Sequence, residues 1–197
     1  MQNIIASQSQ HKIKEEDRLL EFIKIHKENI FKMHKLLQEN NCGFRVIFMH
    51  DNADMLIRLA KHDNSKYSKE EFDGYRIKLY PTEEEQLSAF DKDSFDKAIK
   101  HHYVHNTHHP QHYIDNDGSI RDMPVEDVYE MILDWMANMY FYTKDPIVGT
   151  IEHYESIRDT NLLFSDNTLG LLDYYIFDEL QYISKHSNYQ DTLNKLH

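Results

Sequence analysis

The stretch Lys61-His62-Asp63-Asn64-Ser65-Lys66 decides how the rest of the chain is interpreted, because it sets a histidine beside an aspartate. Such a pair can give an imidazole nitrogen and a carboxylate oxygen to one metal ion, or one ligand to each of two ions. Alone the dipeptide is weak evidence, since chance produces many. Two further features support it: the run His101-His102-Tyr103-Val104-His105-Asn106-Thr107-His108-His109-Pro110, and an isolated Asp134 in an apolar segment. Histidines and carboxylates spread over several helices, without cysteine pairs, are typical of a mono- or dinuclear hydrolytic metal site.

The bulk composition predicts an ordinary globular protein and excludes several classes. The chain has 197 residues, 40% of them hydrophobic and 28% charged, which suits one core. Five glycines and four prolines are few, and this favours helices over a loop-rich β fold. A net charge of −12 argues against binding a nucleic-acid polymer, whose phosphates need a basic surface. A small anionic substrate stays open, because bound metal ions reverse the local field.

Cysteine usage and apolar runs bear on the compartment. The single cysteine, Cys42, excludes an internal disulfide framework. The sequence contains no apolar run of 18 residues, so no membrane-spanning helix is expected. The polar N-terminus lacks the apolar core of a signal peptide. We therefore expect a cytoplasmic protein without a membrane partner. The oligomeric state is left open, with a homodimer among the options.

Apolar residues recur every three to four positions along most of the chain, which predicts an all-α fold. Residues 1–14 are expected to be disordered or frayed, and residues 15–197 to form a single helical domain of six to eight helices. Capping signals mark several starts: Ser68 to Glu71 has capping-box spacing, and Asp122 is expected to be an N-cap with Pro124 in the first turn. Helices are expected at about 15–38, 44–61, 68–80, 91–109, from 122 onward, 145–160 and 166–185.

The order of histidines and aspartates along these helices resembles the HD-domain metal-dependent phosphohydrolases, whose signature is His…His-Asp…Asp. The resemblance implies a helical bundle of HD-domain type. The first histidine is open between His26, His34 and His50, and His26 is preferred because it is central in its apolar stripe. The metal ligands that the resemblance implies are His26, His62, Asp63, His102, His108, His109 and Asp134.

The segment from His62 to Lys66 is also similar to the His-Asp-x-Gly-Lys form of that motif, with Ser65 in place of glycine. In that form the lysine, here Lys66, faces the substrate phosphate. The Gly-Tyr-Pro tripeptide of cyclic-dinucleotide hydrolases is missing, so this substrate is not expected.

A closer resemblance covers roughly residues 26–140. The pattern His-Asp-x-Ser-Lys, His-x-x-x-Asn-x-His-His-Pro and Glu-Met-x-x-Asp-Trp is similar to a family of uncharacterised bacterial and phage proteins. Its three parts here are His62 to Lys66, His102 to Pro110 and Glu130 to Trp135. That family brings no reaction with it, so the activity is inferred from the phosphohydrolases alone.

These resemblances imply a hydrolase that activates water on one or two divalent ions of Mn, Co, Zn or Fe and cleaves a small phosphate ester, of nucleotide type. Lys66 is expected to hold the phosphoryl oxygens, Asp63 to bridge two ions, and Glu130 to orient a ligand or relay a proton. Two alternatives stay open: a di-iron oxygenase of the same superfamily, and a non-catalytic binding or inhibitory module stabilised by its metal.

Overall fold

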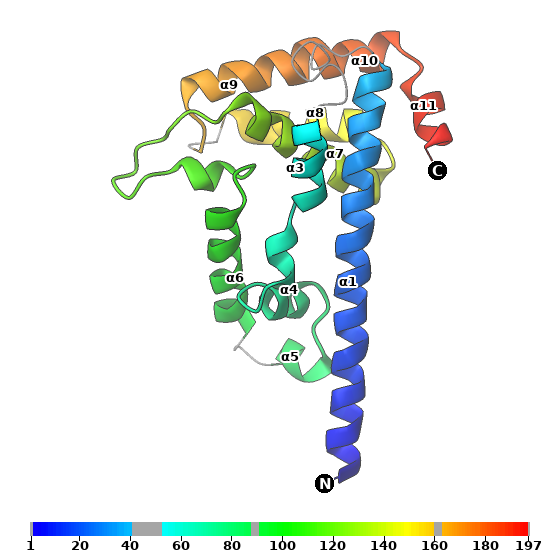
Figure 1. Cartoon of the computed structure of the whole chain (residues 1–197), viewed down its shortest axis with the longest axis vertical. Coiled ribbons are helices and arrows are strands. Elements are labelled where there is room, and N and C mark those ends of the chain that lie inside the picture. The colour runs from blue at the N-terminus through cyan, green and yellow to red at the C-terminus, as the bar shows by residue number, and fades with distance from the viewer. Residues whose placement is uncertain (1, 41–52, 88–90, 160–162, 197) are drawn as a thin grey trace. The chain divides into compact units, whose positions relative to one another are not determined.

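The computed structural model describes residues 2–40, 53–87, 91–159 and 163–196, and their secondary structure is helical (Figure 1). Within these residues no strand occurs, and Ile114 and Ile120 pair only in an isolated antiparallel bridge. The expected all-α fold is therefore confirmed. Side chains are described from residue 14 onward, except those of residues 87, 91 and 92.

The helices follow the predicted order with additional short segments. Short 3-10 turns occur at Asn64–Tyr67 and Pro110–Tyr113. The α-helices are α1 (Gln2–Glu39), α3 (Ala53–Lys61), α4 (Phe72–Leu79), α5 (Glu83–Leu87), α6 (Asp91–His105), α7 (Val125–Thr143), α8 (Pro146–Arg158), α9 (Asp166–Asp173), α10 (Gln181–His186) and α11 (Tyr189–Lys195), with a π-helix, η3 (Tyr174–Leu180), between α9 and α10.

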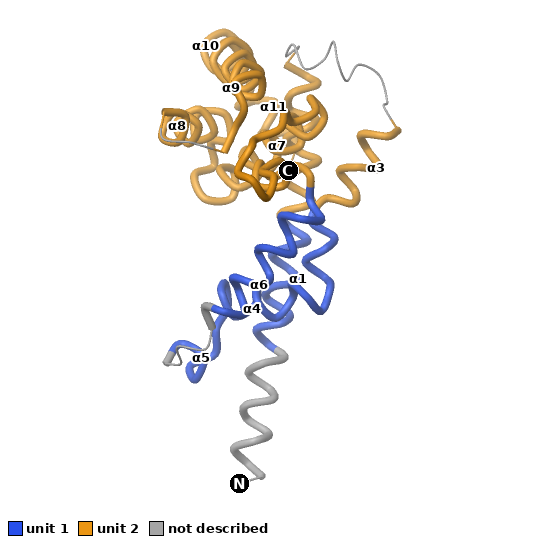
Figure 2. Tube along the Cα trace, turned by 90° about the vertical axis from the view of Figure 1, so that its left-hand side faces the viewer, with its two compact units in different colours: residues 1–25, 63–106 blue, residues 26–62, 107–197 orange. Residues whose placement is uncertain are grey.

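The chain divides into two compact units, which Figure 2 colours separately. Unit 1 comprises Met1–Ile25 and Asp63–Asn106, and unit 2 comprises His26–His62 and Thr107–His197. Helix α1 thus gives its first part to unit 1 and its last part to unit 2. The single domain expected over residues 15–197 stays a prediction.

Unit 1 has a small core in which α4 and α6 pack closely. Leu19 and Ile23 of α1 are buried together with Tyr75 and Ala98. The approach depends on Gly74, because a Cβ there would lie 2.5 Å from the Ala98 Cβ and 2.7 Å from the backbone oxygen of Ser94. Any larger residue at position 74 would have to push α6 away.

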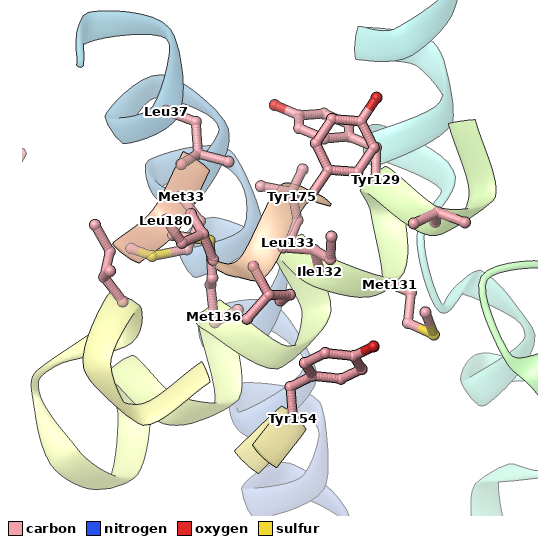
Figure 3. Packing of buried hydrophobic residues seen from close by; sticks show 14 of the residues in the cluster. Met33, Leu37, Tyr129, Met131, Ile132, Leu133, Met136, Tyr154, Tyr175 and Leu180 are labelled. Atoms are coloured by element: carbon pink, nitrogen blue, oxygen red, sulfur yellow. The ribbon is translucent and has the colours of Figure 1, made fainter. Parts of the chain in front are cut away.

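Unit 2 is built around α7. Every residue from Asp127 to Asp134 is buried, so this helix is enclosed on all sides. Figure 3 shows side chains of α1 (Met33, Leu37), α7 (Leu133, Met136) and η3 (Leu180) in one cluster. A fully buried side chain of this kind contributes about 1.5–3 kcal/mol, so the cluster fixes α7 against its neighbours.

Two predicted N-termini are wrong in their details. Helix α7 begins at Val125 with Pro124 at the N-cap, and the Asp122 carboxylate instead accepts hydrogen bonds from Ser165 and Asn167. Helix α4 begins at Phe72, and the Glu71 side chain makes no capping bond. In both cases a more distant partner claims the carboxylate expected to act locally.

The ends of the chain also differ from the expectation. Helix α1 begins at Gln2, so residues expected to be frayed continue the helix; fraying in solution stays a prediction. The helix expected over 166–185 is interrupted by the π-helix, and α11 follows it. Cys42, His50 and the first part of the helix expected at 44–61 lie outside the described residues. Within the described helices, none is long and apolar enough to cross a membrane.

Candidate metal centre

Helix α7 carries three buried carboxylates, Asp127, Glu130 and Asp134, on consecutive turns of an otherwise apolar helix. Burying an ionised carboxylate without a partner costs several kcal/mol. Each of the three must therefore be matched by a cation, a set of donors or a metal ion.

Asp134 meets two histidines of unit 2. The His26 Nε2 lies 3.0 Å from the Asp134 Oδ1, the His62 Nε2 lies 3.8 Å from the same oxygen, and the two Nε2 atoms are 3.3 Å apart. The point equidistant from these three atoms is about 2.0 Å from each, which is the usual distance from a zinc ion to nitrogen or oxygen. These three residues form a buried group that can hold a metal ion.

The packing of unit 2 sets this geometry. Lys27 donates to the Ala60 backbone oxygen at 2.9 Å and so ties α1, which carries His26, to α3, which His62 directly follows. Leu59 of α3 and Ile30 of α1 are completely buried in the core around α7. The histidines and Asp134 therefore come from three elements held by one hydrophobic cluster.

The protonation of Asp134 follows from its neighbours. Burial alone would raise its pKa, but the hydrogen bond and charge of His26 and the charges of His62 and His108 hold the pKa well below the usual value. Asn138 also donates to the Asp134 Oδ1 at 3.0 Å. The carboxylate is therefore ionised at neutral pH, with imidazoles and an amide, rather than Lys or Arg, as the partners that the structure records.

Glu130 orients His62. The His62 Nδ1 lies 2.8 Å from the Glu130 Oε1, and because an ionised carboxylate only accepts, His62 donates from Nδ1. Burial alone would raise the pKa of Glu130, but the hydrogen bonds from His108 and His62 hold it well below its usual range. In the neutral form of His62, the proton on Nδ1 leaves the lone pair of Nε2 facing His26 and Asp134. Glu130 thus has the place of a carboxylate behind a metal-binding histidine.

Arg58 of α3 holds Glu130 in turn. Its Nε donates to the Glu130 Oε2 at 2.5 Å, and its Nη2 contacts Asp127 and donates to the Thr107 Oγ1 at 2.9 Å. Asp127 also accepts from the Tyr113 hydroxyl. Arg58 therefore neutralises the carboxylates on the first turns of α7 and leaves Asp134 outside this network.

A second buried group, His62 with His108 and Glu130, can also hold an ion. The His108 Nδ1 lies 3.4 Å from the Glu130 Oε1, and its ring centroid is 4.3 Å from that of His62. Arg58 already occupies the other oxygen of Glu130, so we favour the group with Asp134. His109 lies beside His108, with ring centroids 4.2 Å apart, and neither group includes it.

Unit 1 contains the remaining predicted residues. Asp63 has a positive φ of 57°, a left-handed conformation that aspartate, asparagine and histidine adopt more readily than other residues with a side chain. The Lys66 Nζ lies 2.5 Å from the Asp63 Oδ2 and 4.9 Å from the centre of the Tyr75 ring. The His102 Nε2 lies 3.3 Å from the Asp63 Oδ1. Asp63, Lys66 and His102 are therefore gathered within this unit.

Glu71, at the start of α4, fixes two histidines of α6. Its Oε2 accepts from the His102 Nδ1 at 2.8 Å and its Oε1 from the His101 Nδ1 at 2.7 Å. Burial alone would raise the pKa of Glu71, but hydrogen bonds from His102, His101 and Ser65 hold it below the usual value. Asn106 completes the arrangement by donating to Ser65 Oγ at 2.7 Å and to the His102 backbone oxygen at 2.8 Å.

Sequence reasoning preferred His26 over two alternatives, and the structure places His26 with His62 and Asp134. His34 instead bonds the Tyr129 hydroxyl at 2.7 Å, and His50 lies outside the described residues. The predicted ligands are divided between the units: His26, His62, His108, His109 and Asp134 in unit 2, and Asp63 and His102 in unit 1.

Sequence reasoning missed Arg58 and Glu71. Arg58 lies on an amphipathic helix and resembles a solvent-facing residue, although its guanidinium reaches two carboxylates 69 and 72 residues further along the chain. Glu71 was assigned to a capping box, but its carboxylate instead bonds His101, which lies 30 residues further along the chain. A buried carboxylate needs hydrogen-bond donors. The adjacent pair His101-His102 was the sequence signal that could have pointed to a carboxylate partner such as Glu71.

Residues 15–177 match a family described only as being of unknown function, DUF5662. The chain belongs to this family. No curated protein and no solved structure matches it. The matched range contains all predicted ligands as well as Arg58, Glu71 and Glu130. The expected membership of an uncharacterised family is confirmed. None of the comparisons shows a resemblance to HD-domain enzymes or names a reaction.

Proposed function

We propose that this chain is a metal-dependent phosphohydrolase that cleaves a small phosphate ester, of nucleotide type, with one or two divalent transition-metal ions. One observation carries the proposal: the His26 Nε2, the His62 Nε2 and the Asp134 Oδ1 converge within 3.0–3.8 Å of one another in a buried site. Three acceptor atoms at such distances repel unless a cation, either a proton or a metal ion, lies among them.

The donor set favours a catalytic ion over a purely structural one. Two imidazoles and one carboxylate are the three protein ligands of open zinc sites, which keep a position for water or substrate. Closed structural sites are more often built from cysteine, and the chain has one cysteine in 197 residues. Imidazole and carboxylate ligands also suit manganese, cobalt and iron, so the donor set allows each metal predicted from the sequence.

A divalent ion here would lower the pKa of a coordinated water and stabilise negative charge on phosphoryl oxygens. Hydrolysis then needs water to add to phosphorus while the ester P–O bond breaks and the leaving oxygen takes a proton. Glu130 keeps the proton of His62 on Nδ1, which presents Nε2 as a ligand. Arg58 holds Glu130 in that orientation. Asp127, Glu130 and Arg58 thus preserve the shape of the site.

The sequence resemblance assigns a role to Lys66, which lies with Asp63 and His102 in unit 1. His102 is fixed by Glu71 so that its Nε2 faces Asp63, and Lys66 brings a positive charge to the same carboxylate. We assign to Lys66 the binding of phosphoryl oxygens. In this role the ammonium exchanges part of its contact with Asp63 for a substrate oxygen.

The substrate class is inferred from charge and from the sequence resemblance. The net charge of −12 disfavours a polymeric nucleic acid, whereas a small phosphate ester needs only a local positive field such as that of a bound metal ion. The resemblance to HD-domain enzymes supports a nucleotide.

The test compares metal content and hydrolysis in the wild type, a His26→Gln/Asp134→Asn variant and a His34→Gln control. His34 is a buried histidine of the same helix that bonds Tyr129 instead of the ligand group. After reconstitution with Mn²⁺, Co²⁺, Zn²⁺ or Fe²⁺, we expect one or two equivalents in the wild type and control, and loss of an equivalent in the variant. Phosphate should be released from a panel of nucleotides and simple esters by the metal-loaded wild type and control, and not by the variant that has lost the metal.

Three outcomes would oppose the proposal in different ways. Equal metal content in all three proteins would show that His26 and Asp134 do not bind the metal. Iron with oxygen consumption and no phosphate release would favour the di-iron oxygenase. Bound metal that is required for folding, with no turnover on either panel, would favour a metal-stabilised binding module.

A further inference from the structure

Two histidines outside the buried groups lie one turn apart on α6. His101 is partly exposed and His105 is exposed. Their rings stack with centroids 3.9 Å apart and an interplanar angle of 19°. Side chains at positions i and i+4 of a helix lie on the same face, so the contact follows from the helical geometry.

The hydrogen bonds of this pair define which nitrogen of each ring carries the proton. The His101 Nδ1 faces the Glu71 Oε1 at 2.7 Å, and the His105 Nδ1 faces the backbone oxygen of His101 at 2.9 Å. A carboxylate and a carbonyl oxygen can only accept, so both Nδ1 atoms donate. In each neutral ring the Nε2 is then an acceptor with a lone pair. The two rings are adjacent on one face of α6, and the exposed His105 ring can turn out of the stack so that the Nε2 lone pairs of both rings reach one ion.

We propose that His101 and His105 form a transition-metal site at the surface of unit 1, separate from the buried groups. The two Nε2 atoms are the protein ligands, and water completes the coordination. Imidazole nitrogen suits Cu²⁺, Ni²⁺ and Zn²⁺, and affinity among these is highest for Cu²⁺. This inference does not rest on the phosphohydrolase function.

Glu71 distinguishes this pair from two histidines that stack by chance. The carboxylate is completely buried, and it is also fixed by His102. It holds the His101 ring in place, as carboxylates behind metal-binding histidines do. The ring of the first ligand is therefore oriented before any ion arrives.

The chain provides a matched control on α10. His186 stacks on Tyr182 with ring centroids 4.4 Å apart and an angle of 22°, and its Nδ1 faces the Tyr182 backbone oxygen at 3.1 Å. This is the same arrangement with tyrosine in place of the first histidine. It offers one imidazole nitrogen and therefore no chelate.

The experiment titrates Ni²⁺ into the full chain by calorimetry in the His26→Gln/Asp134→Asn background, which silences the buried group. His105→Gln is compared with His186→Gln in that background. We expect His105→Gln to remove one equivalent or weaken its binding by at least about 10-fold, because a chelate becomes a single ligand. His186→Gln should leave this equivalent unchanged. Both positions are exposed, so neither change should disturb folding.

A second measurement follows the ligands directly. In the same His26→Gln/Asp134→Asn background, with one equivalent of Cu²⁺, the electron paramagnetic resonance spectrum should show coupling to two imidazole nitrogens, and to fewer when His105→Gln is added. Glu71→Gln should weaken the binding of Ni²⁺ by roughly 10–100-fold. Identical stoichiometry and affinity in the His105 and His186 variants, or an unchanged spectrum in His105→Gln, would overturn the proposal.

Discussion

The two units use the same pairing of histidine with carboxylate but balance its charge differently. In unit 2 the His62 Nδ1 lies 2.8 Å from Glu130, and in unit 1 the His102 Nδ1 lies 2.8 Å from Glu71. In each case the opposite nitrogen, Nε2, faces an aspartate: Asp134 at 3.8 Å from His62, and Asp63 at 3.3 Å from His102.

The third partner makes the difference. In unit 1 Lys66 brings an ammonium to Asp63 at 2.5 Å, whereas in unit 2 His26 brings a second imidazole to Asp134 at 3.0 Å. An ammonium neutralises a carboxylate at any ordinary pH, but an imidazole does so only when it is protonated. Among the described residues, the partners recorded for Asp134 are imidazoles and an amide, so a metal ion there would not have to compete with an ammonium as it would at Asp63.

The largest expected effect separates the two aspartates. Asp134→Asn should weaken the affinity for the first metal equivalent on the order of 10³-fold, or about 4 kcal/mol, because it removes the carboxylate ligand of unit 2. Asp63→Asn should weaken it by about 10-fold, since Lys66 already occupies one oxygen of Asp63. Competition with a fluorescent chelator measures both. A larger loss for Asp63→Asn would reverse the comparison.

Removing the metal should destabilise unit 2 in particular. At a free metal concentration of 100 times Kd, binding contributes about 2.7 kcal/mol, and a chelator should lower the Tm by roughly 5–10 °C. Amide hydrogen exchange should rise in α7 more than in α6. Asp134→Asn should show no response to the chelator, and an equal response in this variant would place the stabilising ion elsewhere.

The two orienting glutamates should act on different sites. Glu130→Gln should weaken the affinity of the buried group roughly 10–100-fold, because the amide can present an N–H to His62 and no longer fixes its proton on Nδ1. Glu71→Gln should have the smaller effect on that group and the larger one on Ni²⁺ bound by His101 and His105. Titrating both variants with Zn²⁺ and Ni²⁺ tests whether each glutamate acts mainly on its own site.

The smallest expected effect comes from an ion pair of unit 1 that contains no histidine. The Arg76 guanidinium bonds Glu85 at 2.5 and 2.9 Å and lowers the pKa of Glu85 to about 2. A lowered pKa stabilises the fold above the unfolded value of about 4.3, and this stabilisation is lost as pH falls toward 2. Glu85 is partly exposed and solvent screens the pair, so Glu85→Gln should cost about 1 kcal/mol at pH 7 and progressively less below pH 4.

Urea unfolding at several pH values measures this difference, with and without chelator. The difference between wild type and Glu85→Gln should be the same in both conditions. A chelator-dependent difference would mean that unit 1 holds an ion near this pair.

Local patterns predicted the helices, while the site needed more than local patterns. The periodicity of α1 and α6 and the Asp145-Pro146 start of α8 were sufficient, and the Asp145 side chain indeed accepts from the Val148 backbone nitrogen. His26 and Asp134 are 108 residues apart, so no helical spacing could predict their contact. It was predicted from the order of histidines and aspartates that resembles the HD-domain enzymes.

Other residues escaped prediction because their partners are distant in sequence. Asp122 and Glu71 carry strong capping signals, yet each is claimed by side chains at least 30 residues away. Local capping and long-range bonding compete for the same carboxylate, and only the folded chain decides between them. The positive φ of Asp63 was not predicted, because aspartate is enriched in that conformation but most aspartates do not adopt it.

The π-helix η3 has a consequence for which mutations the chain can absorb. A π turn holds roughly one residue more than an α turn, so deleting one residue from Tyr174–Leu180 can convert it to α-helix while the flanking helices persist. A one-residue deletion in α7 between Glu130 and Asp134 would rotate all following side chains by about 100° and turn Asp134 away from His26 and His62. Length variation among relatives should therefore be tolerated in η3 and excluded from α7.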